Sequence, residues 1–444
     1  MPIRPQIADH IDRLVTQAQA TGRAPSLILG VVRGGELIHV AAAGDDPTPN
    51  PDTQYRIGSI TKTMTATLVM RLRDEGRLSL DDPLERHLPG TPLGAVTIRH
   101  LLAHVSGLQR EPYGSWWERA PGVAVSDLLA SLDSDMLVLP SQRTFHYSNL
   151  AYGVLGAVVA QLSGEPWFEV LGKQLLQPLG MSRTTYQCAE PFARGYVVHP
   201  FHGTLREEPR HDAGAMAPAG QLWSTVTDLA RWAAFLADPQ PDVISPATVD
   251  EMASVVALSD QVSWTAGYGL GLHLVRRGER VYVGHSGSMP GYLAMLLVYR
   301  PSKVGAVAFC NAYNATVGMQ QLCGAAIDAV LDADPTPPVA WRPATAIPAP
   351  LAELTGRWWF MGIEYAATAE PGDSGGLELV MRPVAQPNAV PWRFTQEGPD
   401  RWRGHSGGNN GELLTVRRDA DGGIVCLDIA TFEFTRDPWP ELGA

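Results

Sequence analysis

The apolar positions at the start of the chain follow the period of a helix. Ile7, Ile11 and Val15 recur at helical spacing with charged residues between them, which predicts an amphipathic helix. The next segment, SLILGVVRGGELIHVAAAG, contains two apolar runs joined by Gly34-Gly35. Two such runs around a glycine turn predict a β-hairpin.

From about Ser59 to Val255 the apolar positions again follow mostly a helical period. The segments that carry it most clearly are SITKTMTATLVMRLRDEG, TIRHLLAHVSGL, NLAYGVLGAVVAQLSG and STVTDLARWAAFLADP. In the last, Thr225 stands three residues before Asp228, which resembles a capping box with Asp in the Glu/Gln place.

Strand patterns then return in YGLGLHLVRRGERVYVGHSG and YLAMLLVYRPSKVGAVAFCNAY. They predict an antiparallel meander, and a helix is expected near 319–331. A sheet built from both ends of this region, with a helical insert between them, is an α+β arrangement.

A Pro-rich stretch without periodicity, residues 332–350, predicts a linker between two domains. Beyond it, the short segments LTGRWWF, LELVMR, RWRGHSGG, ELLTVRR, GIVCLDIA and TFEFTRD alternate with Gly/Asn/Asp turns. We therefore expect a main domain over 1–331 and a small all-β barrel or sandwich over 351–444.

Composition excludes several classes of function. The chain has 444 residues, 34 basic and 46 acidic side chains and a net charge of −12, without a basic cluster for nucleic acid. Its four cysteines form no C-x-x-C pair and no zinc spacing, so neither a metal nor a cofactor is indicated. With no signal-peptide pattern and no apolar stretch long enough to span a bilayer, we expect a cytoplasmic protein.

Three serines lie in strings that resemble the nucleophile motifs of other hydrolases. Ser374 lies in GDSGG, Ser406 in GHSGG and Ser286 in GHSGSMPGY. A G-x-S-x-G elbow needs a strand before the serine and a helix after it. Ser406 and Ser286 are followed by turn and strand patterns, and Ser374 lies in a Pro/Gly loop, so all three are interpreted as loop or strand residues.

Ser59 is the stronger candidate nucleophile. It begins an apolar helical segment, and Lys62 follows three residues later, on the same helix face. A serine hydroxyl needs a neighbouring base, and a desolvated lysine can lose its charge and act as one. Alone, S-x-x-K is a weak signal, since an N-cap serine and a solvated lysine would give the same pattern.

Two further motifs complete a constellation. FHYSNLAYGVLG places Tyr147 and Asn149 just before a helix, where either could also serve only packing and capping. GHSG places His285 on a strand. With Ser59-x-x-Lys62, these motifs resemble, in order and spacing, penicillin-recognising serine enzymes. The branch is that of class C β-lactamases, DD-peptidases, D-aminopeptidases, β-lactamase-fold esterases and penicillin-binding-protein-type thioesterases.

The resemblance covers about residues 7–331 and implies a transpeptidase-type fold and a set of roles. Ser59 would be acylated, Lys62 and Tyr147 would share general-base and general-acid duty, and Asn149 would hold a substrate amide. The resemblance also implies a lipocalin-like barrel for the tail.

The third motif would flank the substrate. The backbone N–H groups of Ser59 and Ser288 would form the oxyanion hole, with Gly287 beside the substrate. His285 stands where the more familiar form has lysine, which weakens a β-lactamase interpretation because a permanent cation is lost. A histidine there could switch charge near neutral pH and donate to Tyr147 or the substrate.

Three more residues are candidates for substrate binding. Trp116 and Trp117 lie in a Pro/Gly loop and could line an acyl pocket, although adjacent aromatics often only pack. Arg436 follows the last strand pattern and could reach a substrate carboxylate if the tail covers the cleft; a surface arginine is the alternative.

The sequence therefore predicts a serine acyl-enzyme catalyst that acts on small-molecule or peptide substrates. D-amino-acid-containing peptides or peptidyl thioesters, some of them carrier-bound, are the expected class. The alternatives are a cytoplasmic carboxylesterase and a non-catalytic penicillin-binding-like sensor or scaffold. The Ser59/Lys62/Tyr147 set argues against the scaffold, since a scaffold needs none of the three.

Overall fold

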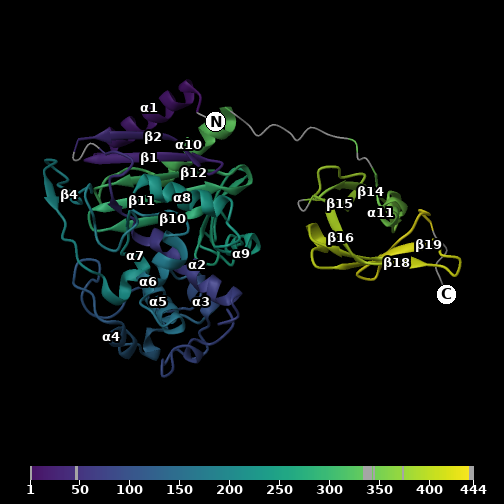
Figure 1. Ribbon diagram of the computed structural model, residues 1–444, viewed down its shortest axis with the longest axis horizontal. Coiled ribbons are helices and arrows are strands. Elements are labelled where there is room, and N and C mark those ends of the chain that lie inside the picture. The colour runs from purple at the N-terminus through teal and green to yellow at the C-terminus, as the bar shows by residue number, and fades with distance from the viewer. Residues whose placement is uncertain (1–2, 46–48, 334–342, 344–345, 373–374, 440–444) are drawn as a thin grey trace. The chain divides into compact units, whose positions relative to one another are not determined.

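An eight-stranded antiparallel sheet organises the N-terminal part of the chain in the computed structural model, which describes residues 3–45, 49–333, 343, 346–372 and 375–439 (Figure 1). The strand order β2-β1-β12-β11-β10-β9-β8-β7 pairs the N-terminal hairpin with the end of the meander, as predicted from the sequence. The strands are β1 Ser26–Arg33, β2 Glu36–Gly44, β7 Ala257–Leu258, β8 Ala266–Tyr268, β9 His273–Arg277, β10 Arg280–Met289, β11 Tyr292–Tyr299 and β12 Val304–Cys310.

Both faces of this sheet are covered, because its central strands are apolar on both sides. Along β1, Leu27, Leu29 and Val31 join one core cluster while Ile28 and Val32 join another, as the period of two requires. The first cluster lies under α1 (Pro5–Gly22) and α10 (Met319–Ala333), and the second lies under α8 (Val226–Ala237) and the helical insert. Figure 1 shows α1 and α10 together on one side of the sheet.

The helical insert contains α2 (Thr61–Asp74), which is buried on nearly all sides although it carries four threonines. Three of their hydroxyls donate to carbonyl oxygens: Thr63 to Ile60 at 2.8 Å, Thr65 to Pro218 at 2.9 Å and Thr67 to Thr63 at 2.9 Å. The buried hydroxyl of Thr61 has no partner among the described residues. Because most of these polar groups are paired, a helix with polar side chains can occupy the core. The other helices of the insert are α3 Ile98–Leu102, α4 Val125–Ala130, α5 Asn149–Ser163, α6 Trp167–Leu171, α7 Ala217–Gly220 and α9 Pro246–Met252.

Some local expectations differ from the structure. The segment TIRHLLAHVSGL is helical only over α3, because His104 takes a left-handed backbone conformation with φ of 56°. Thr225 caps α8 as expected, but Asp228 accepts from the backbone N–H of Arg183 at 2.8 Å and does not close a full capping box. Short strands also interrupt the predicted helical region: β3 Tyr55–Arg56, β4 Tyr196–Val198, β5 Leu205–Glu207 and β6 Trp223–Ser224.

The C-terminal unit is an eight-stranded antiparallel meander that nearly closes into a barrel. Trp359 and Thr435 exchange backbone hydrogen bonds of 2.9 Å and bring the first and last strands together. The sequence missed β14 and β16, whose alternation is interrupted by charged and small residues. The elements are α11 Ala349–Leu354, β13 Gly356–Phe360, β14 Ile363–Pro371, β15 Leu377–Pro383, β16 Trp392–Gly398, β17 Arg401–Gly404, β18 Leu413–Arg418, β19 Ile424–Ile429 and β20 Phe432–Phe434.

The chain divides into the units Met1–Pro337 and Pro338–Ala444. The expected linker, 332–350, lies largely outside the described residues, and its two ends belong to α10 and α11. Among the helices that are described, none has both the length and the apolar character needed to cross a membrane.

Candidate active site

Ser59 and Lys62 meet at the start of α2. Ser59 lies in the 3-10 turn η1 (Gly58–Ile60), which leads directly into the helix. Lys62 Nζ lies 2.9 Å from Ser59 Oγ, and it also donates to the carbonyl oxygen of Ala219 at 2.6 Å. The three-residue spacing and the turn geometry bring the two side chains together, as the sequence pattern predicted.

Lys62 has no exposed surface. Burial lowers the pKa of Lys62 to about 7, and the negative charges of Glu111 and Glu118 only partly oppose this effect. At neutral pH a large fraction of this lysine therefore carries a free lone pair.

Tyr147 lies close to both Ser59 and Lys62. Lys62 Nζ is 5.1 Å from the centroid of its ring. Burial raises the pKa of the Tyr147 phenol, and a hydrogen bond with Ser59 opposes that change in part. The ring centroid of His104 lies 4.3 Å from that of Tyr147, and His104 Nδ1 accepts from the backbone N–H of Ser148 at 3.1 Å. The buried histidine thereby holds the loop that presents the tyrosine.

Strand β10 packs closely against the turn that carries Ser59. A Cβ on Gly287 would lie 1.9 Å from the carbonyl oxygen of Ile57, and one on Gly58 would lie 2.5 Å from the backbone nitrogen of Ser288. Gly58 also has a φ of 50°, a conformation that favours glycine. The two glycines thus allow the backbone of β10 to approach the turn that carries Ser59.

His285 is buried on the same strand, with an exposed fraction of 3%. Its Nδ1 lies 2.5 Å from the carbonyl oxygen of Ser286, and its Nε2 lies 2.9 Å from the hydroxyl of Tyr268. Burial, reinforced by the charge of Lys62, lowers the pKa of His285 to about 3. The ring is therefore neutral, with Nδ1–H donating to the carbonyl and Nε2 accepting from the tyrosine. This differs from the expected charge switch near neutral pH, because burial removes the protonated form.

Asn149 begins α5 beside the nucleophile. Its Nδ2 donates to Glu111 Oε1 at 2.7 Å, and the helix is capped by the neighbouring Ser148, whose hydroxyl accepts from the backbone of Ala151 at 3.1 Å. Trp117 is buried and its indole N–H donates to the other carboxylate oxygen of Glu111 at 2.8 Å. Glu111 thus joins the tryptophan loop to Asn149.

A cavity of about 410 Å³ opens in front of Ser59. Burial raises the pKa of Glu118, one of its lining residues, to about 7, and the charge of Glu111 adds to the effect. The cavity is lined by Ser59, Arg110, Glu118, Tyr147, Asn149, His285, Ser286, Gly287, Ser288, Leu293, Ala294, Val317 and Met319.

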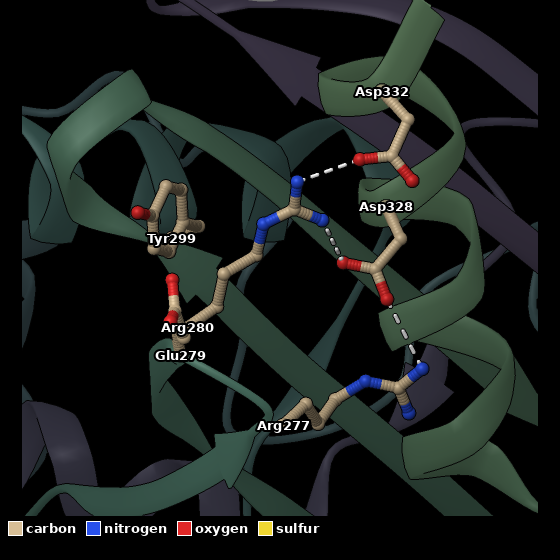
Figure 2. Close-up of a pocket in the computed structure, with 6 residues that line it drawn as sticks. All are labelled: Arg277, Glu279, Arg280, Tyr299, Asp328 and Asp332. Carbon is tan, nitrogen blue, oxygen red and sulfur yellow. Dashed lines mark hydrogen bonds and ion pairs between the residues drawn. The ribbon is translucent and has the colours of Figure 1, made fainter.

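A second cavity of about 650 Å³ lies between the β9–β10 turn and α10 (Figure 2). Four of its charged side chains are paired with one another: Arg280 donates to Asp328 at 2.7 Å and to Asp332 at 2.6 Å, and Arg277 donates to Asp328 at 3.1 Å. It holds ion pairs and no nucleophile, so the cavity at Ser59 is the candidate active site.

Trp116 and Arg436, which were predicted to bind substrate, are not among the residues that line the Ser59 cavity. Trp116 is 49% exposed, with the guanidinium carbon of Arg119 at 5.4 Å from its ring. Arg436 donates to the carbonyls of Glu353, Thr355 and Arg357 at 2.7–2.9 Å within the C-terminal unit. These contacts give Arg436 a structural role in that unit, and its binding of substrate stays a prediction.

The three serines in hydrolase-like strings do not replace Ser59, although Ser286 lines the same cavity. Ser406 donates to the carbonyl oxygen of Pro391 at 2.7 Å in the loop after β17, and a strand follows, as expected. Ser286 lies exposed on β10, and the chain continues into β11. Ser374 lies outside the described residues.

The sequence analysis missed Glu111 and Glu118. Both lie in GLQREPYGSWWERAP, the loop in which only the tryptophans were singled out. Two acidic residues flanking a Trp pair were the available signal. Tyr268, the hydrogen-bond partner of His285, gave no sequence signal, because it lies in an ordinary strand pattern.

Comparison with known proteins identifies both parts of the chain. The family model described as Beta-lactamase matches residues 11–323, and a domain of unknown function, DUF7586, matches 347–436. The chain spans 58–65% of the length of the first curated relatives that it matches.

Two relatives are enzymes by name. The D-alanyl-D-alanine-carboxypeptidase/endopeptidase AmpH of Escherichia coli (strain K12) is 30% identical over 239 residues, which cover 50% of this chain and 59% of AmpH. Esterase EstB of Burkholderia gladioli is 34% identical over 237 residues, covering 48% of this chain and 59% of the esterase.

Solved structures share the fold. An octameric penicillin-binding protein homologue from Pyrococcus abyssi aligns with a TM-score of 0.66 at 22% identity, covering 96% of this chain and 99% of that one. A D-stereospecific amidohydrolase from Streptomyces sp. aligns with a TM-score of 0.62 at 26% identity, covering 73% and 98%. With a family model that matches most of its length, the chain belongs to the beta-lactamase family, a family of serine hydrolases that includes peptidases and esterases.

Proposed function

We propose that this chain forms an acyl-enzyme on Ser59 and acts on peptide-type acyl substrates, either D-amino-acid-containing peptides and amides or peptidyl thioesters. One observation carries the proposal: a buried lysine with a pKa of about 7 lies 2.9 Å from the serine hydroxyl. In its neutral form, Lys62 donates an N–H to the carbonyl of Ala219 and turns its lone pair toward Ser59.

In the first step Ser59 Oγ attacks the carbonyl carbon while its proton moves to Lys62 Nζ. Lys62 is a better first base than Tyr147, because burial raises the pKa of the phenol and keeps it protonated. The tetrahedral oxyanion is held by the backbone N–H groups of Ser59 and Ser288, which the close approach of β10 supports.

The C–N or C–S bond then breaks, and Tyr147 gives its proton to the leaving amine or thiol. The proton held by Lys62 returns to the phenol oxygen, so the pair is reset after acylation. Water or an amine attacks the Ser59 ester in the second step, and the same groups move the protons in reverse.

The neutral state of His285 bears on the choice of substrate. A substrate carboxylate meets no cation at this position, since burial keeps the ring uncharged at neutral pH. This supports amide or thioester substrates that lack a carboxylate beside the scissile bond over β-lactams. The Streptomyces relative is named a D-stereospecific amidohydrolase, whereas AmpH is named a D-alanyl-D-alanine-carboxypeptidase, and the substrates of a carboxypeptidase carry such a carboxylate.

A carboxylesterase is the second candidate. One side of the cavity is apolar, formed by Leu293, Ala294, Val317 and Met319, and suits a short acyl chain. EstB is the named relative that acts on esters.

The test of the nucleophile is labelling with a fluorescent fluorophosphonate followed by peptide mapping. We expect the adduct on Ser59 and its loss in Ser59→Ala, whereas Ser286→Ala and Ser406→Ala serve as matched controls that label normally. An adduct that survives Ser59→Ala contradicts the proposal, and absence of any adduct favours the scaffold alternative.

The substrate class is tested by comparing a short p-nitrophenyl ester, a D-alanyl amide and a peptidyl thioester with an internal amine. Turnover of the amide or thioester is expected. Turnover of the ester alone favours the carboxylesterase, and cyclic product from the thioester identifies an amine as the acyl acceptor.

A further inference from the structure

A buried arginine lies three residues before the candidate nucleophile. Arg56 ends β3 and is 1% exposed. Its Nη2 donates to Gln221 Oε1 at 3.2 Å, while its Nε and Nη1 have no hydrogen-bond partner among the described residues. Burial lowers the pKa of Arg56, and the acidic groups around it only partly oppose this effect. Because a buried charge held by a neutral amide costs stability, the stability of the fold alone does not account for this arginine.

Gln221 joins this arginine to the end of helix α7. Its side chain is 1% exposed and is held at two further points. Oε1 accepts from the backbone N–H of Ala213 at 3.0 Å, and Nε2 donates to the carbonyl oxygen of Tyr186 at 3.0 Å. The amide therefore has a fixed orientation, with its oxygen toward Arg56.

Helix α7 carries the hydrogen-bond acceptor of the lysine. Ala219 lies two residues before Gln221, and its carbonyl oxygen accepts from Lys62 Nζ at 2.6 Å. Only when an N–H of the neutral lysine is held by this carbonyl does the lone pair face Ser59 Oγ, 2.9 Å away. The orientation of the base thus depends on where the end of α7 places one carbonyl group.

The backbone already brings the two segments together. Strand β3 pairs with β6, and the backbone N–H of Ile57 donates to the carbonyl oxygen of Leu222 at 2.9 Å. The hydrogen bond from Arg56 to Gln221 extends this connection by one residue toward Ala219. It therefore fixes the part of the chain that the strand pairing does not reach.

We propose that Arg56 is a positioning residue that fixes the end of α7 through Gln221. The Ala219 carbonyl is thereby held where it directs Lys62 toward Ser59. The inference rests on the proposed acyl-enzyme function and assigns to it a residue that is not among those lining the Ser59 cavity.

The protonation of Lys62 also responds to the groups around it. Burial is the largest influence on its pKa, followed by the opposing charge of Glu111. The ionisable groups that face Lys62 from the surrounding elements are His104, Arg110, Glu111, Glu118, Tyr147, Tyr152 and His285. The substitution Gln221→Met alters none of these groups and leaves the charge of Arg56 in place, so its pH profile reports the hydrogen-bonded carbonyl.

The experiment measures the rate of fluorophosphonate labelling of Ser59 in the full-length chain from about pH 5 to pH 9. The wild-type rate is expected to rise with pH around the pKa of Lys62, about 7. In Gln221→Met the plateau rate should fall about tenfold to hundredfold, because the base is no longer directed. The midpoint should move down by about 0.5–1 pH unit, because the ammonium form loses more than the neutral form when its acceptor moves.

Two variants of Arg56 separate positioning from general stability. Arg56→Met should lower the plateau rate as Gln221→Met does, and the double variant should be within about twofold of the slower single variant, because both changes remove the same hydrogen bond. Arg56→Lys keeps a donor and the charge, and should recover part of the rate. Each rate is normalised to the fraction of chains that label at completion, so a loss of folded protein does not contribute.

Arg71→Met is the matched control. Arg71 lies on α2, and its Nε donates to Gln174 Oε1 at 3.2 Å, the same length as the bond from Arg56 to Gln221. Its loss removes a comparable hydrogen bond that has no connection to the Ala219 carbonyl. The plateau rate is expected to stay within about twofold of wild type and the midpoint to stay unchanged.

The outcomes distinguish the positioning role from the proposed function. Additive losses in the double variant, an unchanged midpoint in Gln221→Met, or wild-type rates in both single variants overturn the role of Arg56, even when Ser59 labels normally. An Arg71→Met variant that loses as much rate as Arg56→Met also overturns it. A wild-type Ser59 that does not label, or that labels at the same rate on both sides of pH 7, overturns the proposed function and the positioning role with it.

Discussion

Replacing Lys62 by methionine is expected to abolish acylation and to raise stability. Lys62 is completely buried, and its pKa of about 7 in the fold compares with 10.5 for an exposed lysine. The difference of about 3.5 pH units, at 1.36 kcal/mol each, means that the lysine destabilises the folded state by about 5 kcal/mol at low pH.

The lysine also forms hydrogen bonds that the variant loses, and this loss offsets part of the expected stabilisation. Without Lys62, the carbonyl oxygen of Ala219 and the hydroxyl of Ser59 lose their donor, which costs about 1–3 kcal/mol. The net expectation is that Lys62→Met raises the free energy of unfolding by about 2–4 kcal/mol at pH 6.

The stability difference between Lys62→Met and the wild-type chain is expected to decrease as the pH rises. Between about pH 7 and 10.5 the unfolded chain keeps the lysine proton and the folded chain has lost it. The unfolded state therefore binds more protons, and the wild-type free energy of unfolding rises with pH in this window. The advantage of Lys62→Met should accordingly shrink by about 2–3 kcal/mol from pH 6 to pH 9.

The assay is urea denaturation of both proteins at pH 6, 7.5 and 9, with Lys173→Met as the control. Lys173 is an exposed lysine paired with Glu165, so its loss should change stability by less than about 0.5 kcal/mol at every pH. A Lys62→Met variant less stable than wild type at pH 6, or a stability difference independent of pH, would refute the reasoning.

Three further outcomes follow from the geometry. In Gly287→Ala the new Cβ would meet the carbonyl oxygen of Ile57 at 1.9 Å, so β10 must move and the rate of labelling should fall about 10²–10³-fold; an unchanged rate removes the oxyanion-hole assignment. Tyr147→Phe should slow amide turnover about 10²–10⁴-fold, yet leave fluorophosphonate labelling of Ser59 within about tenfold, because fluoride needs no proton donor; equal losses in both assays would contradict its role as acid. Arg436→Ala should lower the thermal stability of the C-terminal unit, since three carbonyls lose their donor, and labelling kinetics at normal rates are expected; a large loss of substrate affinity instead would support the predicted substrate contact.

The local sequence was sufficient to predict the contact between the candidate nucleophile Ser59 and Lys62. Ser59 and Lys62 are three residues apart on one helix, so their contact depends on helical geometry and hardly on the rest of the fold. The N-terminal hairpin and the meander were also predictable from local sequence, because their turns and strands are each specified by a few consecutive residues. The hairpin and the meander pair through β1 and β12, which agrees with the prediction that both belong to one sheet.

The charge states could not be read from the sequence. Lys62 and His285 are both shifted by burial, and burial depends on which helices and strands cover them. A histidine beside a serine suggested a switch near neutral pH; the structure encloses it and pairs it with Tyr268, 17 positions away. Desolvation is a property of the whole packed site.

The sequence by itself determined the fold class, the order of the motifs and the residues that could react. The tertiary structure decided how they are set for chemistry: β10 approaches Ser59 because Gly58 and Gly287 leave room for backbone contact, and burial lowers the pKa of Lys62 to about 7. The physical reason is that helical spacing and strand alternation act over a few residues, whereas close backbone approach, burial and electrostatic balance depend on segments that are distant in the chain.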